Sequence, residues 1–226
     1  MSNINIATFI DHTLLKPDST LDQVKAICKE ALEHRFAGVC VSGYFTKETA
    51  QILLDSGLKT ATVVGFPMGY NVIPAKVEEI KKAIHEGTDE LDVVINLNAI
   101  KSQNWSYVRN EIDTIVMATH LHGRKIKVIL ETGLLTSDEL KKLCDICNPL
   151  LPDFVKTSTG INGAGATPEI VRILRAYLEP KIKIKASGGI KTLADALALI
   201  EAGAQRIGTS SAMAMLTEQK AINNNQ

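Results

Sequence analysis

Short apolar stretches alternate with longer amphipathic ones along almost the whole chain of 226 residues. The short stretches are rich in Val, Ile and Leu and predict strands at 9–15, 38–42, 59–66, 90–96, 125–132, 153–159, 181–187 and 205–210. The longer stretches repeat apolar residues at helical spacing and predict helices at 21–35, 47–57, 75–87, 105–123, 137–147, 167–178, 193–203 and 212–221. This alternation has the period of a repeated βα unit.

Residues at the ends of the predicted helices support these boundaries. Thr136 or Ser137 is expected to cap one helix, and Thr167, followed by Pro168, to cap another. Four predicted helices end in a glycine, which suits a left-handed terminator: Gly57, Gly87, Gly123 and Gly203. No linker or charge block divides the chain, so we expect one domain over residues 1–226, with a frayed tail from about 218 to 226.

Eight strands that alternate with helices predict parallel pairing, because each crossover then contains a helix. Two α/β architectures remain open, a closed (β/α)8 TIM barrel and an open doubly wound sheet. The count of eight favours the barrel, although the chain is compact beside the ~250 residues typical of that fold. The open sheet has less support, since no GxGxxG or GxxxxGK[ST] motif follows an early strand.

Composition narrows the class of protein. Apolar residues make up 45% of the chain, charged residues 22%, and the formal net charge is zero, which gives no reason to expect nucleic acid or an anionic membrane as a partner. The N-terminus has no basic region before a long apolar run, and no apolar stretch approaches the ~20 residues of a membrane span. We therefore expect a cytoplasmic protein with reduced cysteines.

Cys144 and Cys147 form a CxxC motif inside a predicted helix. The pattern favours two helix residues that face the core. A metal or redox pair is the alternative, but no second Cys or His pair of suitable spacing accompanies it.

Polar residues gather where the predicted strands end, which is where a barrel places its active site. The strand ends carry Asp11, Thr13, Cys40, Ser42, Asp92, Asn96, Glu131, Thr132, Lys156 and Lys185. The last two strands continue into "SGGI" (187–190) and "GTSS" (208–211). Glycines, hydroxyls and a helix start in consecutive late loops predict a phosphate site.

Lys156 ends an apolar strand in "FVKTSTG", where a buried ammonium is costly unless its charge is matched or lost. A lysine attacks a carbonyl only as the neutral amine, so its pKa must fall from about 10.4 to near 7, which takes about 4.6 kcal/mol. A second ammonium about 6 Å away would supply about 2.8 kcal/mol of this at an effective dielectric constant of 20. Lys185 is the expected source, because it lies nearer its strand end than Lys181 or Lys183. Desolvation would supply the remainder.

Such an amine forms a Schiff base with a carbonyl substrate, and the proton transfers that follow need an acid/base group. Asp92 is the first candidate for that group and Glu131 the second. The alternative is a structural salt bridge between Lys156 and Asp92.

Eight motifs, in order along the chain, are similar to those of a known family: "DHTLLKPD" (11–18), "VCVS" (39–42), "VVGFPMG" (63–69), "DELDVVIN" (89–96), "KVILET" (127–132), "FVKTSTG" (154–160), "KASGGI" (185–190) and "RIGTSS" (206–211). The sequence resembles the deoxyribose-phosphate aldolases, class I aldolases with a (β/α)8 fold. The resemblance implies reversible cleavage of 2-deoxy-D-ribose 5-phosphate to D-glyceraldehyde 3-phosphate and acetaldehyde, in deoxynucleoside catabolism. It implies a small sugar phosphate and an aldehyde as partners, no metal or cofactor, and a homo-oligomer, either a dimer or a tetramer.

On the matching positions, the resemblance makes Lys156 the Schiff-base lysine, Lys185 the residue that lowers its pKa, and Asp92 the group that moves protons through a bound water. The residues implied to bind substrate and its phosphate are Asp11, Thr13, Gly160, Ser187, Gly188, Gly189, Gly208, Ser210 and Ser211.

The chain departs from the family pattern in three places. Lys191 stands where many members have arginine, Asn98 stands where glycine is usual, and no tyrosine lies near the C-terminus. Three other functions stay open. They are a transaldolase-like Schiff-base enzyme, a metal-dependent or isomerase barrel, and a sugar-phosphate-binding barrel without catalysis.

Overall fold

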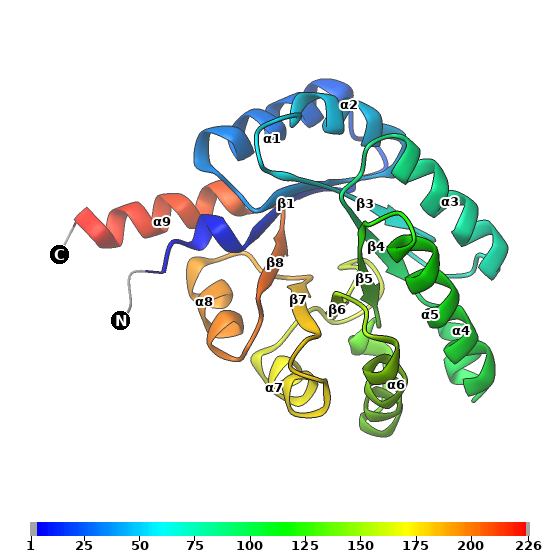
Figure 1. The fold of residues 1–226 in the computed structure, drawn as a ribbon. Helices are drawn as coiled ribbons and strands as arrows, with labels where there is room; N and C mark the ends of the chain where they lie inside the picture. Colours follow the sequence, from blue (N-terminus) through cyan, green and yellow to red (C-terminus); the bar gives the residue numbers. More distant parts are fainter. Residues whose placement is uncertain (1–3, 225–226) are drawn as a thin grey trace.

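In a computed structural model, which describes residues 4–224, eight parallel strands close into a barrel in chain order (Figure 1). The strands are β1 (Ile10–Leu14), β2 (Gly38–Val41), β3 (Lys59–Val64), β4 (Glu90–Val94), β5 (Lys125–Ile129), β6 (Phe154–Lys156), β7 (Lys183–Ser187) and β8 (Arg206–Thr209). Because β1 pairs with β8, the sheet has no free edge. The predicted (β/α)8 barrel is confirmed, and the open doubly wound sheet is excluded.

The helices surround the barrel (Figure 1). They are α1 (Leu21–His34), α2 (Thr46–Ile52), α3 (Ile73–His85), α4 (Leu97–Lys101), α5 (Trp105–His120), α6 (Ser137–Leu150), α7 (Pro168–Tyr177), α8 (Leu193–Glu201) and α9 (Ala212–Asn224). Three short 3-10 turns complete the chain, η1 (Ile6–Phe9), η2 (Gly43–Phe45) and η3 (Thr132–Leu134). Among the described residues, no helix is long and apolar enough to cross a membrane.

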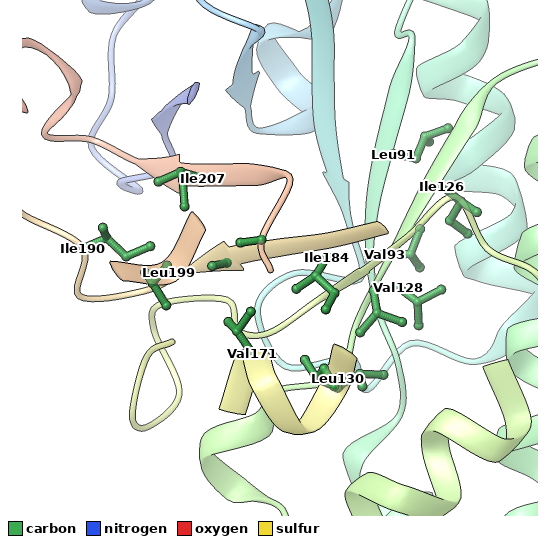
Figure 2. Packing of buried hydrophobic residues seen from close by; sticks show 14 of the residues in the cluster. Leu91, Val93, Ile126, Val128, Leu130, Val171, Ile184, Ile190, Leu199 and Ile207 are labelled. Atoms are coloured by element: carbon green, nitrogen blue, oxygen red, sulfur yellow. The ribbon is translucent and has the colours of Figure 1, made fainter. Parts of the chain in front are cut away.

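Side chains alternate between the two faces of each strand, and the two faces differ in chemistry. Leu91 and Val93 of β4 belong to the apolar layer that also contains Val171 and Leu199 of the surrounding helices (Figure 2). The alternate residues of β4, Glu90 and Asp92, are buried and make ion pairs with other strands. Barrel interiors are usually filled by branched apolar side chains, so a charged interior needs a functional explanation.

The helix ends follow the predicted chemistry. Thr136, not Ser137, caps α6: its hydroxyl accepts from the N–H of Glu139 while the Glu139 carboxylate accepts from the N–H of Thr136. Thr167 caps α7 with Pro168 in the first turn. The four glycines predicted as terminators all have positive φ, but only Gly87, Gly123 and Gly203 follow a helix end closely; Gly57 lies five residues after the end of α2.

Several elements differ from their predicted extents. α2 ends at Ile52 rather than at 57. β6 ends at Lys156 rather than at 159, and the residues after it are held by side-chain bonds: the Thr157 hydroxyl donates to the carbonyl of Ser187, and Thr159 donates to the Glu131 carboxylate. The short helix α4 was not predicted, and it is capped by Asn96. α9 stays helical through 218–224, the segment expected to fray, and the Gln219 side chain bonds to the chain near the N-terminus. Residues 225–226 of the expected tail lie outside the described residues.

A buried ion pair outside the barrel fixes the loop after β3. The Lys76 ammonium donates to the carbonyls of Gly69 (2.9 Å) and Val94 (2.7 Å) and lies 2.6 Å from the Glu111 carboxylate. Burial lowers the pKa of Lys76 and raises that of Glu111, although each opposes the change in the other. The loop that forms one rim of the barrel mouth is therefore tied to β4 and α5.

Cys144 and Cys147 are buried side chains of the α6 face that packs on the core. Burial raises the pKa of both thiols, which keeps them protonated. Their interpretation as core residues is confirmed. Over residues 4–224, no group of three or more His, Cys, Asp or Glu side chains could hold a metal ion.

Candidate active site

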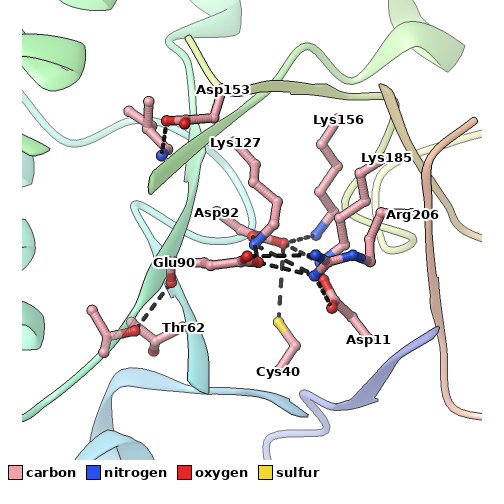
Figure 3. Close-up of polar contacts among 12 residues, drawn as sticks. Asp11, Cys40, Thr62, Glu90, Asp92, Lys127, Asp153, Lys156, Lys185 and Arg206 are labelled. Atoms are coloured by element: carbon pink, nitrogen blue, oxygen red, sulfur yellow. Dashed lines mark hydrogen bonds and ion pairs between the residues drawn. The ribbon is translucent and has the colours of Figure 1, made fainter. Parts of the chain in front are cut away.

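Seven charged side chains from six strands form one ionic network inside the barrel (Figure 3). They are Asp11 from β1, Glu90 and Asp92 from β4, Lys127 from β5, Lys156 from β6, Lys185 from β7 and Arg206 from β8.

Asp92 lies at the centre of the network. Its Oδ1 is 2.8 Å from Lys127 Nζ, and its Oδ2 is 2.8 Å from both Lys156 Nζ and Lys185 Nζ. Burial alone would raise the pKa of this carboxyl, but the three ammonium groups together hold it well below its usual range. Asp92 is therefore an ionised carboxylate in contact with three lysines.

Asp11 and Glu90 are the other two carboxylates of the network, and they pair with Lys127, Lys185 and Arg206. The Asp11 carboxylate accepts from Lys185 Nζ and from the Arg206 guanidinium, each at 2.5 Å. Glu90 pairs with Lys127 Nζ at 2.6 Å and with Arg206 at 3.0 Å. Burial raises the pKa of Asp11, and the cations, led by Lys185, more than offset it, so the pKa lies below its ordinary value.

The carboxylates keep two of the lysines charged. Burial lowers the pKa of Lys185, but Asp11 and Asp92 reverse this effect and bring the pKa above its ordinary value. Lys127 shows the same balance, with Asp92 and Glu90 as the main opposing groups. Both side chains are fully buried ammonium groups at neutral pH.

Lys156 occupies a different position. Its ammonium has one carboxylate contact, the Asp92 oxygen that it shares with Lys185, so the two nitrogens are separated by at most twice that contact distance. Lys156 also lines a pocket of about 310 Å³ at the barrel mouth. Lys156 thus both forms a salt bridge with Asp92 and lines a pocket, so the two interpretations of this lysine do not exclude each other.

The pocket contains most of the predicted substrate-binding residues. Those that line it are Thr13, Gly160, Ser187, Gly188, Gly189, Gly208, Ser210 and Ser211. Lys16 and Lys191, which were not predicted as binding residues, line it as well, and no Asp or Glu does. Asp11, also predicted to bind substrate, is not among the residues that line the pocket: its carboxylate accepts from Lys185 and Arg206 inside the barrel.

Glycine is required where the pocket loops meet. A Cβ on Gly188 would lie 2.9 Å from Gly165 Cα and 3.2 Å from Gly160 Cα, and Gly188 has a φ of +88°. The loops after β6 and β7 therefore contact through their backbones. This close approach leaves backbone groups, rather than side chains, to face the pocket.

Glu131, the second acid/base candidate, lies away from the lysines. Its backbone is left-handed (φ 58°), and its buried carboxylate accepts from the N–H of Thr159 at 3.0 Å and from the Thr159 hydroxyl at 2.5 Å. The same hydroxyl accepts from the amides of Ile161 and Asn162. Glu131 thereby holds the loop after β6.

Comparison with known proteins shows which family the chain belongs to. A family model described as the DeoC/LacD family aldolase matches residues 5–217. The chain belongs to this aldolase family. The predicted resemblance is confirmed, and so is the prediction that the chain is an enzyme of the aldolase, or lyase, class.

Relatives of this chain match over nearly their full length. A deoxyribose-phosphate aldolase of Caldicellulosiruptor saccharolyticus is 47% identical over 96% of this chain and 100% of its own. One of Caldanaerobacter subterraneus subsp. tengcongensis is 45% identical over 97% of this chain and 95% of its own. The solved deoxyribose phosphate aldolase from Aeropyrum pernix, described as having a unique tetrameric structure, superposes with a TM-score of 0.89 at 34% identity over 96% of this chain and 92% of its own.

The DeoC/LacD aldolase network contains three residues that were not predicted as site residues, Glu90, Lys127 and Arg206. Glu90 lies two residues before Asp92 on β4 and therefore on the same face of the strand, and this alternation could have identified it as a site residue. Arg206 begins β8, where a charged side chain resembles an ordinary solvated strand start. Lys127 lies in the middle of β5, and the strand pattern alone does not say which face of β5 points into the barrel. Lys183, which shares the strand parity of Lys185, is exposed and lies over the Phe154 ring.

Proposed function

We propose that this aldolase reversibly cleaves 2-deoxy-D-ribose 5-phosphate to D-glyceraldehyde 3-phosphate and acetaldehyde through a Schiff base on Lys156. The observation that carries the proposal is the position of Lys156: among the seven network side chains, it is the one that lines the pocket. The names of the relatives support the substrate, and the pocket has the size of a small-molecule site.

The charges of the network favour Lys156 as the amine that reacts. When every group is ionised, four cations oppose three carboxylates. Lys127, Lys185 and Arg206 each contact two carboxylates at 3.0 Å or less, whereas Lys156 contacts one. If Lys156 loses its proton, three cations face three carboxylates, and each carboxylate still contacts two cations. If another cation of the network loses its proton, two carboxylates each lose a contact with a positive charge.

The reaction follows from this amine. The neutral Lys156 nitrogen attacks C1 of the open-chain sugar, and loss of water gives a protonated imine. Removal of the C3 hydroxyl proton breaks the C2–C3 bond, releases glyceraldehyde 3-phosphate, and leaves an enamine on the lysine. Protonation at C2 and hydrolysis then release acetaldehyde. Asp92, through a bound water, is the proposed group for these proton transfers, and the ammonium of Lys185 keeps it ionised.

The phosphate is proposed to bind at the mouth, on the loops after β7 and β8. The N–H groups of Gly188 and Gly189 have no acceptor among the described residues, and Ser210 and Ser211 line the same pocket. Free amides and hydroxyls in a pocket without carboxylates suit a phosphate dianion. Gly160, Ser187, Gly208 and Thr13 complete the lining.

Product analysis tests the substrate. The purified protein is incubated with 2-deoxyribose 5-phosphate, and glyceraldehyde 3-phosphate and acetaldehyde are measured with coupled dehydrogenases. We expect equal amounts of the two products, and no activity in Lys156→Ala. Turnover of a ketose phosphate with transfer to an aldose, without acetaldehyde, would indicate a transaldolase-like enzyme and contradict the proposal.

Two further expectations stay predictions of the proposed function. The steps above need no metal or cofactor, so activity should survive exhaustive treatment with a chelator. A homo-oligomer, dimer or tetramer, is proposed because the Aeropyrum pernix relative is described as a tetramer. Light scattering on the purified protein tests this, since a monomer at micromolar concentration would contradict it. The cytoplasm stays the predicted compartment.

A further inference from the structure

Three lysines and no carboxylate line the pocket. Lys156 belongs to the ionic network, Lys16 lies on the loop after β1, and Lys191 lies on the loop after β7. Within residues 4–224, the ammonium groups of Lys16 and Lys191 form no ion pair and no hydrogen bond, whereas Lys81 on the surface of α3 pairs with Glu78. Two lysines without a carboxylate partner among the described residues thus line a pocket proposed to receive a dianion.

The start of α8 contributes less to anion binding than a free helix N-terminus would. The Asp195 carboxylate accepts from the N–H groups of Lys191 and Thr192, and the Thr192 hydroxyl accepts from the N–H of Asp195. These amides would otherwise be available to an anion, and Asp195 adds a negative charge beside them. On the α8 side of the pocket, positive charge for a phosphate must therefore come largely from side chains.

The strand order places the two lysines on either side of the serines. β8 pairs with β7 on one side and with β1 on the other. The loop with Ser210 and Ser211 therefore lies between the loop that carries Lys191 and the loop that carries Lys16. A phosphate on the serines would be flanked by an ammonium from each side. A lysine contributes a point charge rather than a planar fork, so two of them provide contacts that one does not.

We propose that Lys16 is a phosphate-binding residue of this pocket and determines, together with Lys191, the preference for phosphorylated over unphosphorylated sugars. This inference rests on the proposed function, and it assigns a role to the loop after β1 that the lysine chemistry does not require. Lys16 is exposed and outside the ionic network, so its replacement leaves the Schiff-base machinery intact.

The test compares Lys16→Ala with Lys181→Ala. Lys181 is an exposed lysine just before β7, at the opposite end of the barrel, and its loss changes the net charge equally. KM and kcat are measured for 2-deoxyribose 5-phosphate and for 2-deoxyribose, and inorganic phosphate is titrated by calorimetry. For Lys16→Ala we expect about a tenfold higher KM for the phosphorylated sugar, phosphate binding weaker by a similar factor, and unchanged kcat/KM for 2-deoxyribose.

Lys181→Ala should match the unchanged protein in all these measurements, and Lys16→Arg should retain most of the phosphate affinity because it keeps the cation. The proposal is overturned if Lys16→Ala behaves like Lys181→Ala, or if it weakens both sugars equally. If the unchanged protein cleaves neither sugar, the proposed function fails instead. The phosphate titration still decides the role of Lys16 in that case, since it needs no turnover.

Discussion

Lys156 differs from the other cations inside the barrel in the number of carboxylates that it contacts. Lys127 and Lys185 each lie within 2.8 Å of two carboxylates, and removing one partner of such a buried pair typically costs about 3–5 kcal/mol. Lys156 shares a single oxygen with Lys185 and meets the pocket. The proposed nucleophile is thus the lysine of the network with the fewest carboxylate contacts.

Replacing Lys185 tests the like-charge account of activation. Lys185→Leu removes a fixed positive charge beside the Lys156 nitrogen and leaves Asp92 less neutralised, and both changes favour the protonated form of Lys156. We expect at least about a tenfold lower rate and a shift of the activity–pH profile upward by about one to two units. The profile is measured on enzyme shown to be folded by circular dichroism. An active variant with an unchanged profile would rule out this account.

A second pair of variants separates the two acid/base candidates. Asp92→Asn removes the charge in contact with three lysines, and we expect a loss of about 10²- to 10⁴-fold in kcat. Glu131→Gln keeps an oxygen that accepts from Thr159, so kcat should stay within about threefold. Steady-state kinetics on both variants decide the question. Equal losses would assign Glu131 a direct part in proton transfer.

The sequence predicted the central residues of the site but not the whole network. Lys156, Lys185 and Asp92 were identified by their places at strand ends and by family motifs, and the structure brings them together on one carboxylate oxygen. Lys127 was missed because strands buried on both faces do not reveal which side points inward. Asp11 was grouped with the substrate-binding residues because strand position alone cannot show that Lys185 and Arg206 engage its carboxylate.

At the scale of elements, the loops after β6 and β7 depend on a backbone contact that only glycine permits. An alanine at Gly188 would approach Gly165 Cα to 2.9 Å, whereas one at Gly189 would meet nothing within 4 Å. Both positions have positive φ, which costs about 1–2 kcal/mol for alanine. The two glycines therefore form a matched pair: both have positive φ, but only Gly188 lacks room for a Cβ.

We therefore expect Gly188→Ala to destabilise the protein by about 3 kcal/mol and Gly189→Ala by about 1 kcal/mol. Urea unfolding of both variants measures the difference. Equal destabilisation would show that the loops relax apart without cost and that their contact does not shape the pocket.

Element boundaries were predictable where local chemistry sets them. The Thr136 and Thr167 caps lie at the observed helix starts, and Gly87, Gly123 and Gly203 follow the observed helix ends. Gly57 does not, because α2 ends at Ile52. The end of β6 was not predictable, because Thr157 and Thr159 have the β-branched composition of a strand and leave it through bonds to Ser187 and Glu131. Contacts between segments distant in sequence decide such boundaries.

At the scale of the whole molecule, the ionic network should set how stability depends on pH. The pKa values of Asp11 and Asp92 lie below their ordinary values, so their contribution is present above about pH 4 and is lost as pH falls further. The pKa values of Lys127 and Lys185 are raised, so their contribution is present below about pH 10 and is lost above the raised values. Between these limits the network should contribute a constant stability.

Asp11→Asn isolates the acidic limb. We expect lower stability at pH 7 but a shallower decline below pH 4, with the difference between the two proteins shrinking by on the order of 1 kcal/mol by pH 3. Denaturant unfolding from pH 3 to 8 measures this difference. A constant difference over that range would mean that the Asp11 carboxylate does not carry the acid sensitivity.

The account as a whole rests on one covalent bond, between Lys156 and the carbonyl carbon of the substrate. The protein is incubated with acetaldehyde, reduced with borohydride, digested and mapped by mass spectrometry, with Lys156→Ala as the control. The account predicts an ethyl group on Lys156 and on no other network lysine, and no such adduct inside the barrel of the variant. An unmodified Lys156, or an adduct on Lys185 or Lys127 instead, would contradict it.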